Sequence, residues 1–207
     1  MKTRIVTLIT LATIALSISV ANASTIKNYT DSNSSSAPVT VAINNINKIE
    51  ASGNVEVYIT NGDKDGVKVY DKYYSKNALV QGKDGVLRIS SYTNDKLVVL
   101  VTVTDLRTIT ADDNATIKSY GKLSAIDLNV VLNNNASAQL KLDAFVANFT
   151  LNNRATANLS GNINDYTMNH SQSSTINKTE LTAVNVTEKN TTKEIARLTA
   201  ANNVASL

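Results

Sequence analysis

Hydrophobic and polar residues alternate through the first half of the chain with the period of two that is typical of β-strands. Val55, Val57 and Ile59 fall on one face of such a strand, and the residues between them fall on the other. The turn sequence NGDKDG at 61–66 is followed by a second alternating run, VKVY. We therefore predict a hairpin over residues 54–70.

The next strands are bounded by a second turn and a longer apolar run. The sequence QGKDG at 81–85 is a turn that leads into the strand VLRIS. In KLVVLVTVTDL, apolar residues occupy both parities over 97–101. Such a run predicts a strand that is covered on both faces.

The second half of the chain repeats itself at a short interval. Residues 122–137 align without a gap on residues 141–156, a shift of 19, and eight positions are identical. Shorter copies follow, and the anchor leucines of the four copies are Leu123, Leu142, Leu159 and Leu181. A period of roughly 17–22 residues that is rich in β-formers predicts an all-β fold, a β-hairpin-led β-helix or β-solenoid.

The repeated asparagines fall where such a fold needs corners. Asparagine tolerates a positive φ better than other non-glycine residues, and stacked amides can form a hydrogen-bonded ladder. We predict that Ala136 and Ala155 fit into the tight bends that follow. The predicted stacks are Asn133, Asn152 and Asn169, and Asn134, Asn153 and His170. The functional alternative is a polar binding stripe along one edge.

The two ends of the chain differ from its middle. Lys2 and Arg4 precede an apolar run that ends in Ala-Asn-Ala, so residues 1–23 are predicted to be a secretory signal peptide; the alternative is an uncleaved anchor. Residues 24–38 are Ser-rich and predict a flexible tether. The solenoid is expected over 39–190, followed by a cap or a worn last coil at 191–207.

The charge balance argues against nucleic acid as a partner. Without Lys2 and Arg4, 18 of the 20 basic residues face 17 acidic ones, so the mature net charge is +1. No later segment is long and apolar enough to span a bilayer. We expect an exported protein that is periplasmic, extracellular or on the outer surface, with an oligomeric state that the sequence leaves open.

The order of these motifs resembles one known family. Three segments carry the resemblance, 46–62, 80–90 and 101–117, and they are followed by the short repeats. The matching positions are Ile46, Ile49, Gly53 and Val55 in the opening motif, and Asp84, Gly85, Leu87 and Ile89 in the second. They resemble the auto-transporter adhesin head GIN domain family.

The resemblance covers about residues 39–190. It implies a right-handed β-helix-like head that is exported and associated with the envelope, with adhesion as its role. Two departures stand out, since Thr104 replaces the family's usual proline and asparagine corners replace its Ser-Gly corners. The family offers no catalytic residues to carry over.

The sequence contains no recognisable catalytic or metal set. His170 is the single histidine and cysteine is absent, which excludes a zinc site, and a corner position explains His170 better than a catalytic triad does. Asp112, Asp113 and Asn114 could offer oxygens to calcium, but they match the 133–136 corner and lack the spacing of a calcium loop. We expect no enzyme, metal or cofactor.

The tyrosine cluster in VYDKYY is the candidate binding site. Tyr70, Tyr73 and Tyr74 could stack on sugar rings or contact a surface protein, and the alternative is that they are strand residues at the open end of the stack. The function that the sequence favours is an exported, non-catalytic solenoid that presents a surface to a glycan or protein. A polysaccharide-acting β-helix enzyme and a structural or assembly protein of the envelope are the alternatives.

Overall fold

The computed structural model describes residues 39–41, 43, 45–70 and 78–191. Contacts between residues divide the chain into two units, 1–34 and 35–207, and every described residue belongs to the second. The predicted signal peptide 1–23 and tether 24–38 lie outside the described residues. So does the predicted C-terminal cap beyond Thr191.

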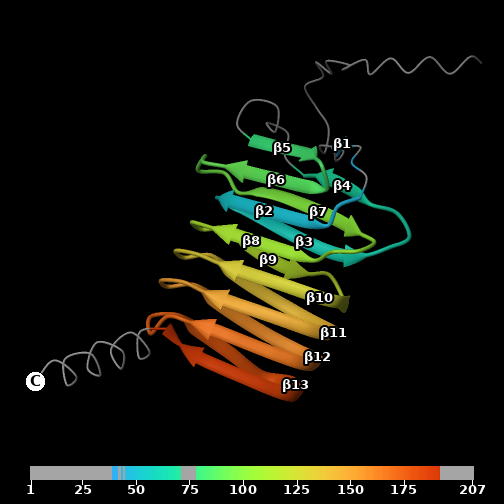
Figure 1. The fold of residues 1–207 in the computed structure, drawn as a ribbon. Coiled ribbons are helices and arrows are strands. Elements are labelled where there is room, and N and C mark those ends of the chain that lie inside the picture. Colours follow the sequence, from blue (N-terminus) through green and yellow to red (C-terminus); the bar gives the residue numbers. More distant parts are fainter. Residues whose placement is uncertain (1–38, 42, 44, 71–77, 192–207) are drawn as a thin grey trace, which may run out of the picture. The chain divides into compact units, whose positions relative to one another are not determined.

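The described residues form one sheet of thirteen strands, which confirms the all-β class (Figure 1). The strands are β1 Val39–Val41, β2 Lys48–Gly53, β3 Val55–Asn61, β4 Gly66–Val69, β5 Ala78–Lys83, β6 Val86–Ser91, β7 Leu97–Val103, β8 Thr108–Asp112, β9 Thr116–Ser119, β10 Leu123–Leu132, β11 Ser137–Leu151, β12 Thr156–His170 and β13 Thr175–Asn190.

The hairpin predicted over residues 54–70 is wrong. The strand β7 lies between β3 and β4, parallel to the first and antiparallel to the second. The opening segment is not a hairpin either, because β2 and β3 pair with different neighbours on the two sides of a corner at Gly53 and Asn54. The pairing is decided by strands far along the chain, which local alternation cannot reveal.

A tight hairpin does occur at the second predicted turn. The strands β5 and β6 pair antiparallel, with Lys83 opposite Val86. The two residues between them, Asp84 and Gly85, have φ values of 51° and 79°. A two-residue turn with positive φ at both positions matches the twist of the flanking strands, which explains the Asp-Gly sequence.

The strand β7 is buried on one face, not on both as predicted. Leu97, Val99 and Val101 point into the core and are fully buried. Val98 and Leu100 on the other face are half-buried. Their partial cover comes from the neighbouring strands, since Leu100 lies opposite Tyr58 and Lys68.

Parallel pairing builds the rest of the sheet. Each of the strands β10, β11 and β12 pairs in parallel with the strand that follows it. One line of the register runs through Leu123, Leu142, Gly161 and Leu181. The predicted anchor Leu159 lies opposite Leu140 instead, and Gly161 takes the position that the repeat predicts for Leu159.

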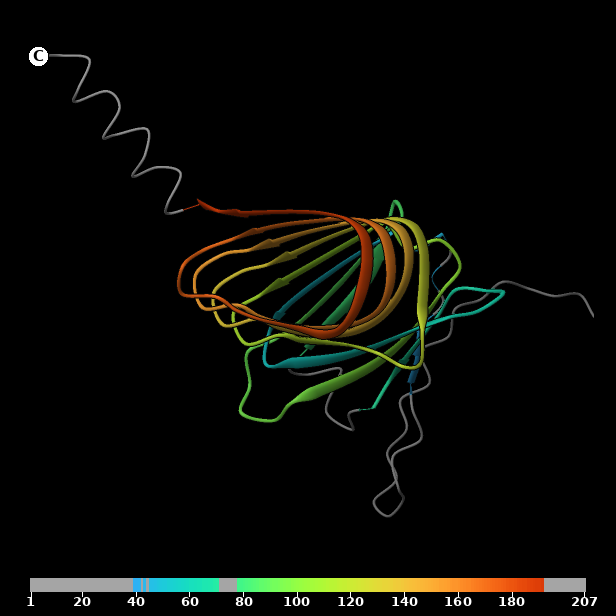
Figure 2. The same cartoon turned by 90° about the horizontal axis from the view of Figure 1, so that it is seen from below.

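The order of strands in the stack differs from their order in the chain. The strands β6 and β7 lie on one side of β2 and β3, and β8 and β9 lie on the other (Figure 1). Seen from below, β10 to β13 follow the same curved outline one over another (Figure 2). Consecutive strands therefore turn at aligned corners, and these corners are the feature that positions the candidate site.

The core lies inside this curved outline. It consists of inward-facing Val, Ile, Leu and Ala side chains, joined by the aromatic residues Phe149 and Tyr166. The two ring centroids are 5.7 Å apart and the rings are tilted by 44°, an arrangement that favours aromatic contact. The Tyr166 hydroxyl is buried and has no hydrogen-bond partner among the described residues. Burial, and to a smaller extent the nearby Glu188, raises the pKa of Tyr166.

The strand β13 is largely exposed because no described strand lies beyond it. At the position opposite the buried Met168, β13 carries Glu188, which forms an ion pair with Lys178. The Lys178 ammonium also lies 5.8 Å from the Tyr166 ring centroid. This end of the sheet therefore combines a charged pair near the last core ring with the exposed apolar side chains of Val184 and Val186 on the same strand.

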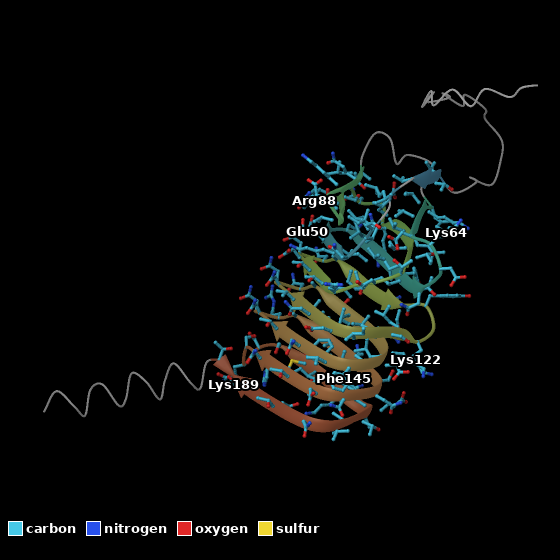
Figure 3. All side chains as sticks on the ribbon, turned by 45° about the vertical axis from the view of Figure 1, so that its right-hand side comes forward. Glu50, Lys64, Arg88, Lys122, Phe145 and Lys189 are labelled. Atoms are coloured by element: carbon cyan, nitrogen blue, oxygen red, sulfur yellow. The ribbon has the colours of Figure 1, made fainter. Side chains whose placement is uncertain are left out.

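Ion pairs connect neighbouring strands on the outer surface. Glu50 on β2 accepts from Arg88 on β6 at 2.8 Å and from Lys48 at 2.6 Å (Figure 3). Glu56 on β3 is the more buried centre, with a side chain 13% exposed, and it lies 2.6 Å from Lys118 and 3.4 Å from Lys96. The hydrogen bond from Lys118, followed by that from the Tyr58 hydroxyl, lowers the pKa of Glu56 to about 2.

We expect the protein to lose stability in acid because of Glu56. A carboxyl group whose pKa falls from 4.5 to about 2 on folding stabilises the native state above pH 4.5, and this stabilisation disappears as the pH falls toward 2. The upper bound on this contribution is about 3.4 kcal/mol, and screening by solvent makes the actual contribution smaller. Urea unfolding of the wild type and of Glu56→Gln between pH 2 and 7 measures it: the difference between the two curves should shrink in acid. A constant difference at every pH would contradict this assignment.

Candidate functional site

The corners between consecutive strands form one line along an edge of the stack. We define four corner segments, residues 112–115, 133–136, 152–155 and 171–174. In the first three, the second residue has a positive φ, 60° at Asp113, 60° at Asn134 and 59° at Asn153. Aspartate and asparagine adopt this region more readily than other side chains, which explains their selection here.

An alanine closes each of these three corners. The N–H of Ala136 donates to the Asn133 carbonyl at 3.0 Å, and the equivalent bond at Ala155 is 3.3 Å long. Both alanines are fully buried, and so is Ala115 in the first corner. A larger side chain at a fully buried position would have to displace its packed neighbours, so burial favours a small residue at this bend.

Side-chain hydrogen bonds run from corner to corner in three parallel ladders. In the first ladder, Asn152 donates to Asn133 at 2.8 Å, and Asn133 donates to Asp112 at 2.7 Å. In the second, Asn153 donates to Asn134 at 3.0 Å, and Asn134 donates to Asp113 at 3.3 Å. The third joins Arg154 to Asn135 and Asn135 to Asn114, at 3.0 and 3.4 Å.

The ladders contain four of the six residues that we predicted as stacks. Asn133 lies next to Asn152, and Asn134 lies next to Asn153, as expected from the shift of 19. The assignment of Asn169 and His170 to these stacks is wrong, because they lie opposite Thr150 and Leu151 at the end of β12. The fourth corner begins at Ser171, two residues later than predicted, and Ser171 and Ser173 donate to the Asn153 carbonyl.

His170 has only local hydrogen-bond neighbours. Its Nδ1 lies 3.0 Å from the Ser171 carbonyl and 3.5 Å from the Ser174 hydroxyl. No hydrogen bond joins it to a carboxylate in the described part of the chain. Its surroundings therefore lack the third member of a catalytic triad.

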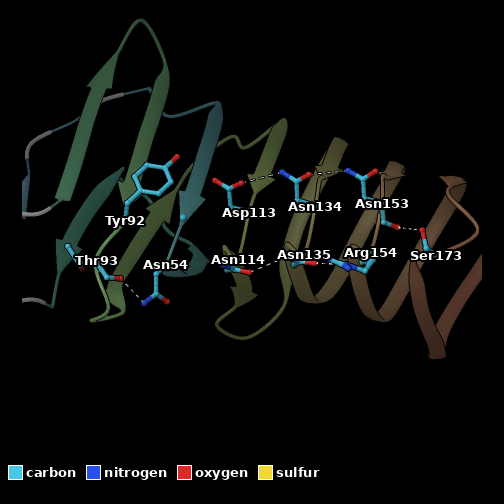
Figure 4. A pocket seen from close by; sticks show the side chains of 11 residues that line it. Asn54, Tyr92, Thr93, Asp113, Asn114, Asn134, Asn135, Asn153, Arg154 and Ser173 are labelled. Atoms are coloured by element: carbon cyan, nitrogen blue, oxygen red, sulfur yellow. Dashed lines mark hydrogen bonds between the residues drawn. The ribbon is translucent and has the colours of Figure 1, made fainter.

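The exposed side of the corners is a groove of about 860 Å³ (Figure 4). We call it the corner groove. Its lining residues are Gly53, Asn54, Tyr92, Thr93, Asp113, Asn114, Asn134, Asn135, Asn153, Arg154 and Ser173. The members come from six different turns of the chain, and nearly all of them present amide, hydroxyl or charged groups.

Tyr92 and Asn54 form one end of the corner groove. The Tyr92 side chain is 75% exposed, and its hydroxyl lies 3.3 Å from the Ser52 hydroxyl. Asn54 donates to the carbonyls of Thr93 and Asn94 at 3.2 and 3.0 Å, which fixes its orientation. Sequence reasoning missed both residues, because no local signal shows that residues so far apart in the chain meet at one edge.

The candidate tyrosines of the sequence lie elsewhere or outside the described residues. Tyr70 follows β4, is 45% exposed, and donates its backbone N–H to the Val98 carbonyl at 2.9 Å. Tyr73 and Tyr74 lie outside the described residues. Tyr70 is not among the residues that line the corner groove.

The described part of the chain contains no recognisable metal site. No three His, Asp or Glu side chains gather there in a way that could hold a cation. Asp112, Asp113 and Asn114, the calcium alternative, each accept a hydrogen bond from the next corner. The arrangement is that of a ladder, and it leaves these oxygens facing amide donors.

A second groove of about 810 Å³ lies at a different edge and is more apolar. It includes Ile126, which is 80% exposed, and the exposed Phe145 lies on the neighbouring strand β11. Figure 3 shows Phe145 on the outer surface of β11. The rim carries Asp105, which pairs with Arg107 at 2.6 Å.

The described residues form an all-β domain with a polar groove along its corners, and comparison with known proteins gives the family. The sequence profile described as "Putative auto-transporter adhesin, head GIN domain" matches residues 45–206, so the chain belongs to this family. No curated protein matches the sequence. No helix in the described part of the chain has the length and hydropathy of a membrane span.

Two crystal structures of putative adhesins share the fold. One is from Parabacteroides merdae, with 19% identity and a TM-score of 0.54, and the other is from Parabacteroides distasonis, with 20% identity and a TM-score of 0.55. Each match covers 74% of this chain and 77% of the other. At this level of identity, the likeness concerns the fold.

We expect Asn134→Val to destabilise the protein by about 2–3 kcal/mol. The substitution removes two ladder bonds and forces a β-branched residue to φ 60°. Asn134→Gly keeps the backbone conformation and should cost only about 1 kcal/mol. Chemical denaturation of both variants measures the difference. Equal stability of Asn134→Val and the wild type would show that the corner tolerates any residue.

Proposed function

We propose that the protein is an exported, non-catalytic adhesin-like head that binds a carbohydrate along the corner groove. The observation that carries this proposal is the set of three side-chain ladders, which fixes a row of amides on an exposed edge next to Tyr92. A binding protein gains affinity when its polar groups are oriented before the ligand arrives. The ladders provide such orientation.

The chemistry of the groove suits sugars. Asn134 and Asn135 each use one N–H and one side-chain oxygen lone pair within their ladders, so a second N–H and a second lone pair of each amide remain for a ligand. Sugar hydroxyls both donate and accept, and they match such amides. The exposed ring of Tyr92 offers an apolar face on which a sugar ring can stack.

The spacing of the corners suits a polymer. Neighbouring strands lie about 4.8 Å apart, so equivalent groups on successive corners repeat at that interval. A ligand with repeating units can therefore make similar contacts with several corners. A small ligand would use only a part of the groove.

We further propose that the stacked strands are a right-handed β-solenoid with short repeats of roughly 17–22 residues. The parallel registers, in which each long strand pairs with the equivalent segment of the next copy, support this proposal. Residues 24–38 would serve as a tether and 191–207 as a cap or last coil. The pattern of residues 1–23 supports export through a secretory signal.

The lining of the corner groove supports a role in binding. Enzymes that hydrolyse glycosides usually place two carboxylates on either side of the bond that breaks. Asp113 is the single carboxylate among the residues that line the groove. The family to which the chain belongs is likewise described by adhesion.

A protein partner is the second candidate. The exposed residues Ile126 and Phe145 favour it, because large apolar side chains on a strand surface mark contact sites when they gather. Both lie outside the lining of the corner groove, and Ile126 lines the second groove. Variants can therefore test the two surfaces separately.

A glycan array followed by calorimetry on the purified protein tests the proposal. We expect binding to at least one oligosaccharide class and a loss of at least tenfold in affinity in Tyr92→Ala. Tyr70→Ala and Phe145→Ala are matched aromatic controls and should bind as the wild type does. If a control variant lost binding while Tyr92→Ala bound as the wild type does, the binding site would lie outside the corner groove.

A further inference from the structure

Arg154 differs from the other arginines in the described part of the chain. Arg88 pairs with Glu50 at 2.8 Å and Arg107 with Asp105 at 2.6 Å. Arg154 forms no ion pair among the described residues, although it lines a polar groove. No carboxylate among the described residues therefore neutralises the charge of its guanidinium.

The ladder orients this guanidinium. The Nε of Arg154 donates to the Asn135 Oδ1 at 3.0 Å, and its backbone N–H donates to the Asn134 carbonyl at 2.9 Å (Figure 4). No hydrogen bond from its two terminal nitrogens occurs within the described residues. These nitrogens belong to the planar fork with which arginine binds carboxylates through two parallel hydrogen bonds.

The corner itself does not need an arginine. The equivalent positions in the two preceding corners are Asn114 and Asn135, and in the next corner Ser173. An asparagine at position 154 could donate the same bond to Asn135, with less side-chain entropy to lose. The positive charge is thus an addition to the ladder that its architecture does not explain.

Charge is distributed unequally along the corner groove. Among the lining residues, Arg154 is the single cation and Asp113 the single anion, and they belong to corners two strands apart. Two strand spacings correspond to about 10 Å, so the two charges act on different parts of a bound chain. An anionic group fits at Arg154, and uncharged hydroxyls fit at Asp113.

We propose that the corner groove takes an acidic glycan, with a sugar-borne anion held by the fork of Arg154 and neighbouring sugar hydroxyls on the asparagine amides. Tyr92 stacks on a sugar ring at the other end of the groove. This inference rests on the proposed function and narrows its ligand class. The anion is a carboxylate of a uronic or sialic acid, or a sulfate ester, because all of these match the same fork.

Calorimetry with matched ligands tests the inference. The probes are oligogalacturonate, its carboxyl-reduced neutral counterpart, a sialylated oligosaccharide and a sulfated one. We expect the wild type to bind at least one acidic probe tenfold or more tightly than the neutral one. The carboxylated and sulfated probes identify which anion the fork prefers.

Variants separate the charge of Arg154 from its structural bond. Arg154→Gln keeps an amide donor for Asn135 and should lose at least tenfold in affinity for the acidic probe and much less for the neutral one. Arg154→Lys keeps the charge without the fork and should recover only part of the loss. Both variants should unfold at nearly the wild-type temperature, since the side chain is exposed.

The outcomes distinguish the two levels of the proposal. Acidic and neutral probes that bind equally, with Arg154→Gln unchanged and Tyr92→Ala weakened, would overturn the acidic ligand and leave carbohydrate binding in place. Absence of binding to every probe and to the glycan array would overturn both. A wild-type preference for the acidic probe that persists unchanged in high salt would overturn the ion-pair contact, because exposed charge contacts are screened by salt.

Discussion

Gly161→Ala is expected to destabilise the protein by roughly 3–5 kcal/mol, which is among the largest effects of a single substitution. Gly161 lies on β12 between Leu142 and Leu181 on the two neighbouring strands. Its φ is +100°, and an added Cβ would lie 2.0 Å from the Leu142 carbonyl oxygen. Backbone on an adjacent strand cannot move aside without breaking the parallel pairing. Thermal unfolding should show a midpoint lower by about 10 °C or more.

Two other glycines separate the causes of this effect. Gly121 also has a positive φ, +83°, but an added Cβ there meets nothing within 4 Å. Gly66 has open space and no positive φ. We expect Gly121→Ala to cost about 1–2 kcal/mol and Gly66→Ala less than about 0.5 kcal/mol. Equal destabilisation in all three variants would contradict the close contact between the Gly161 and Leu142 backbones.

Phe149→Ala is expected to cost about 3–5 kcal/mol through the cavity that it leaves. The Phe149 side chain is fully buried on β11 and packs against the ring of Tyr166 on β12. The core contains no tryptophan, and the chain has two phenylalanines in all, so few large side chains can fill the space. Chemical denaturation should show a lower midpoint with a nearly unchanged slope.

Phe145→Ala is the matched control on the same strand. The Phe145 side chain is 60% exposed on the outer face. Its removal should change the free energy of unfolding by less than about 0.5 kcal/mol. If Phe145→Ala were as destabilising as Phe149→Ala, the assignment of inner and outer faces on β11 would be wrong.

The periodic part of the fold could be predicted from the sequence because its partners are similar copies. Residues 122–137 and 141–156 align with a shift of 19, and the same offset is the register between β10 and β11. When neighbouring strands have similar sequences, aligning these sequences also predicts which residues lie opposite each other. The asparagine pairs 133/152 and 134/153 follow from the same offset.

The irregular part could not be predicted, because its partners do not resemble each other. The strand β7 lies between β3 and β4 although it follows both of them in the chain. In β12, the sequence alignment pairs Leu159 with Leu142, but the residue that lies opposite Leu142 is Gly161. A match between two leucines is a stronger signal in a sequence than a match between a leucine and a glycine. The same error displaced Asn169 and His170 from the ladder.

The candidate site includes residues from both the periodic and the irregular part of the fold. Its asparagines come from the periodic corners, where the sequence indicates polar stacks. Tyr92 and Asn54 come from the irregular strands, and Arg154 stands within a repeat but departs from it. A departure from a repeat at an exposed corner is a usable signal, because the scaffold does not require it.

Chemical-shift mapping tests the central claim, that the corner groove is the binding surface, most directly. The isotope-labelled protein would be titrated with the oligosaccharide that binds best in the array. We predict the largest changes in the side-chain amides of Asn134, Asn135 and Asn153 and in the Nε resonance of Arg154. Changes confined to the surface around Ile126 and Phe145, or around Tyr70, with the corner resonances unmoved, would contradict the account.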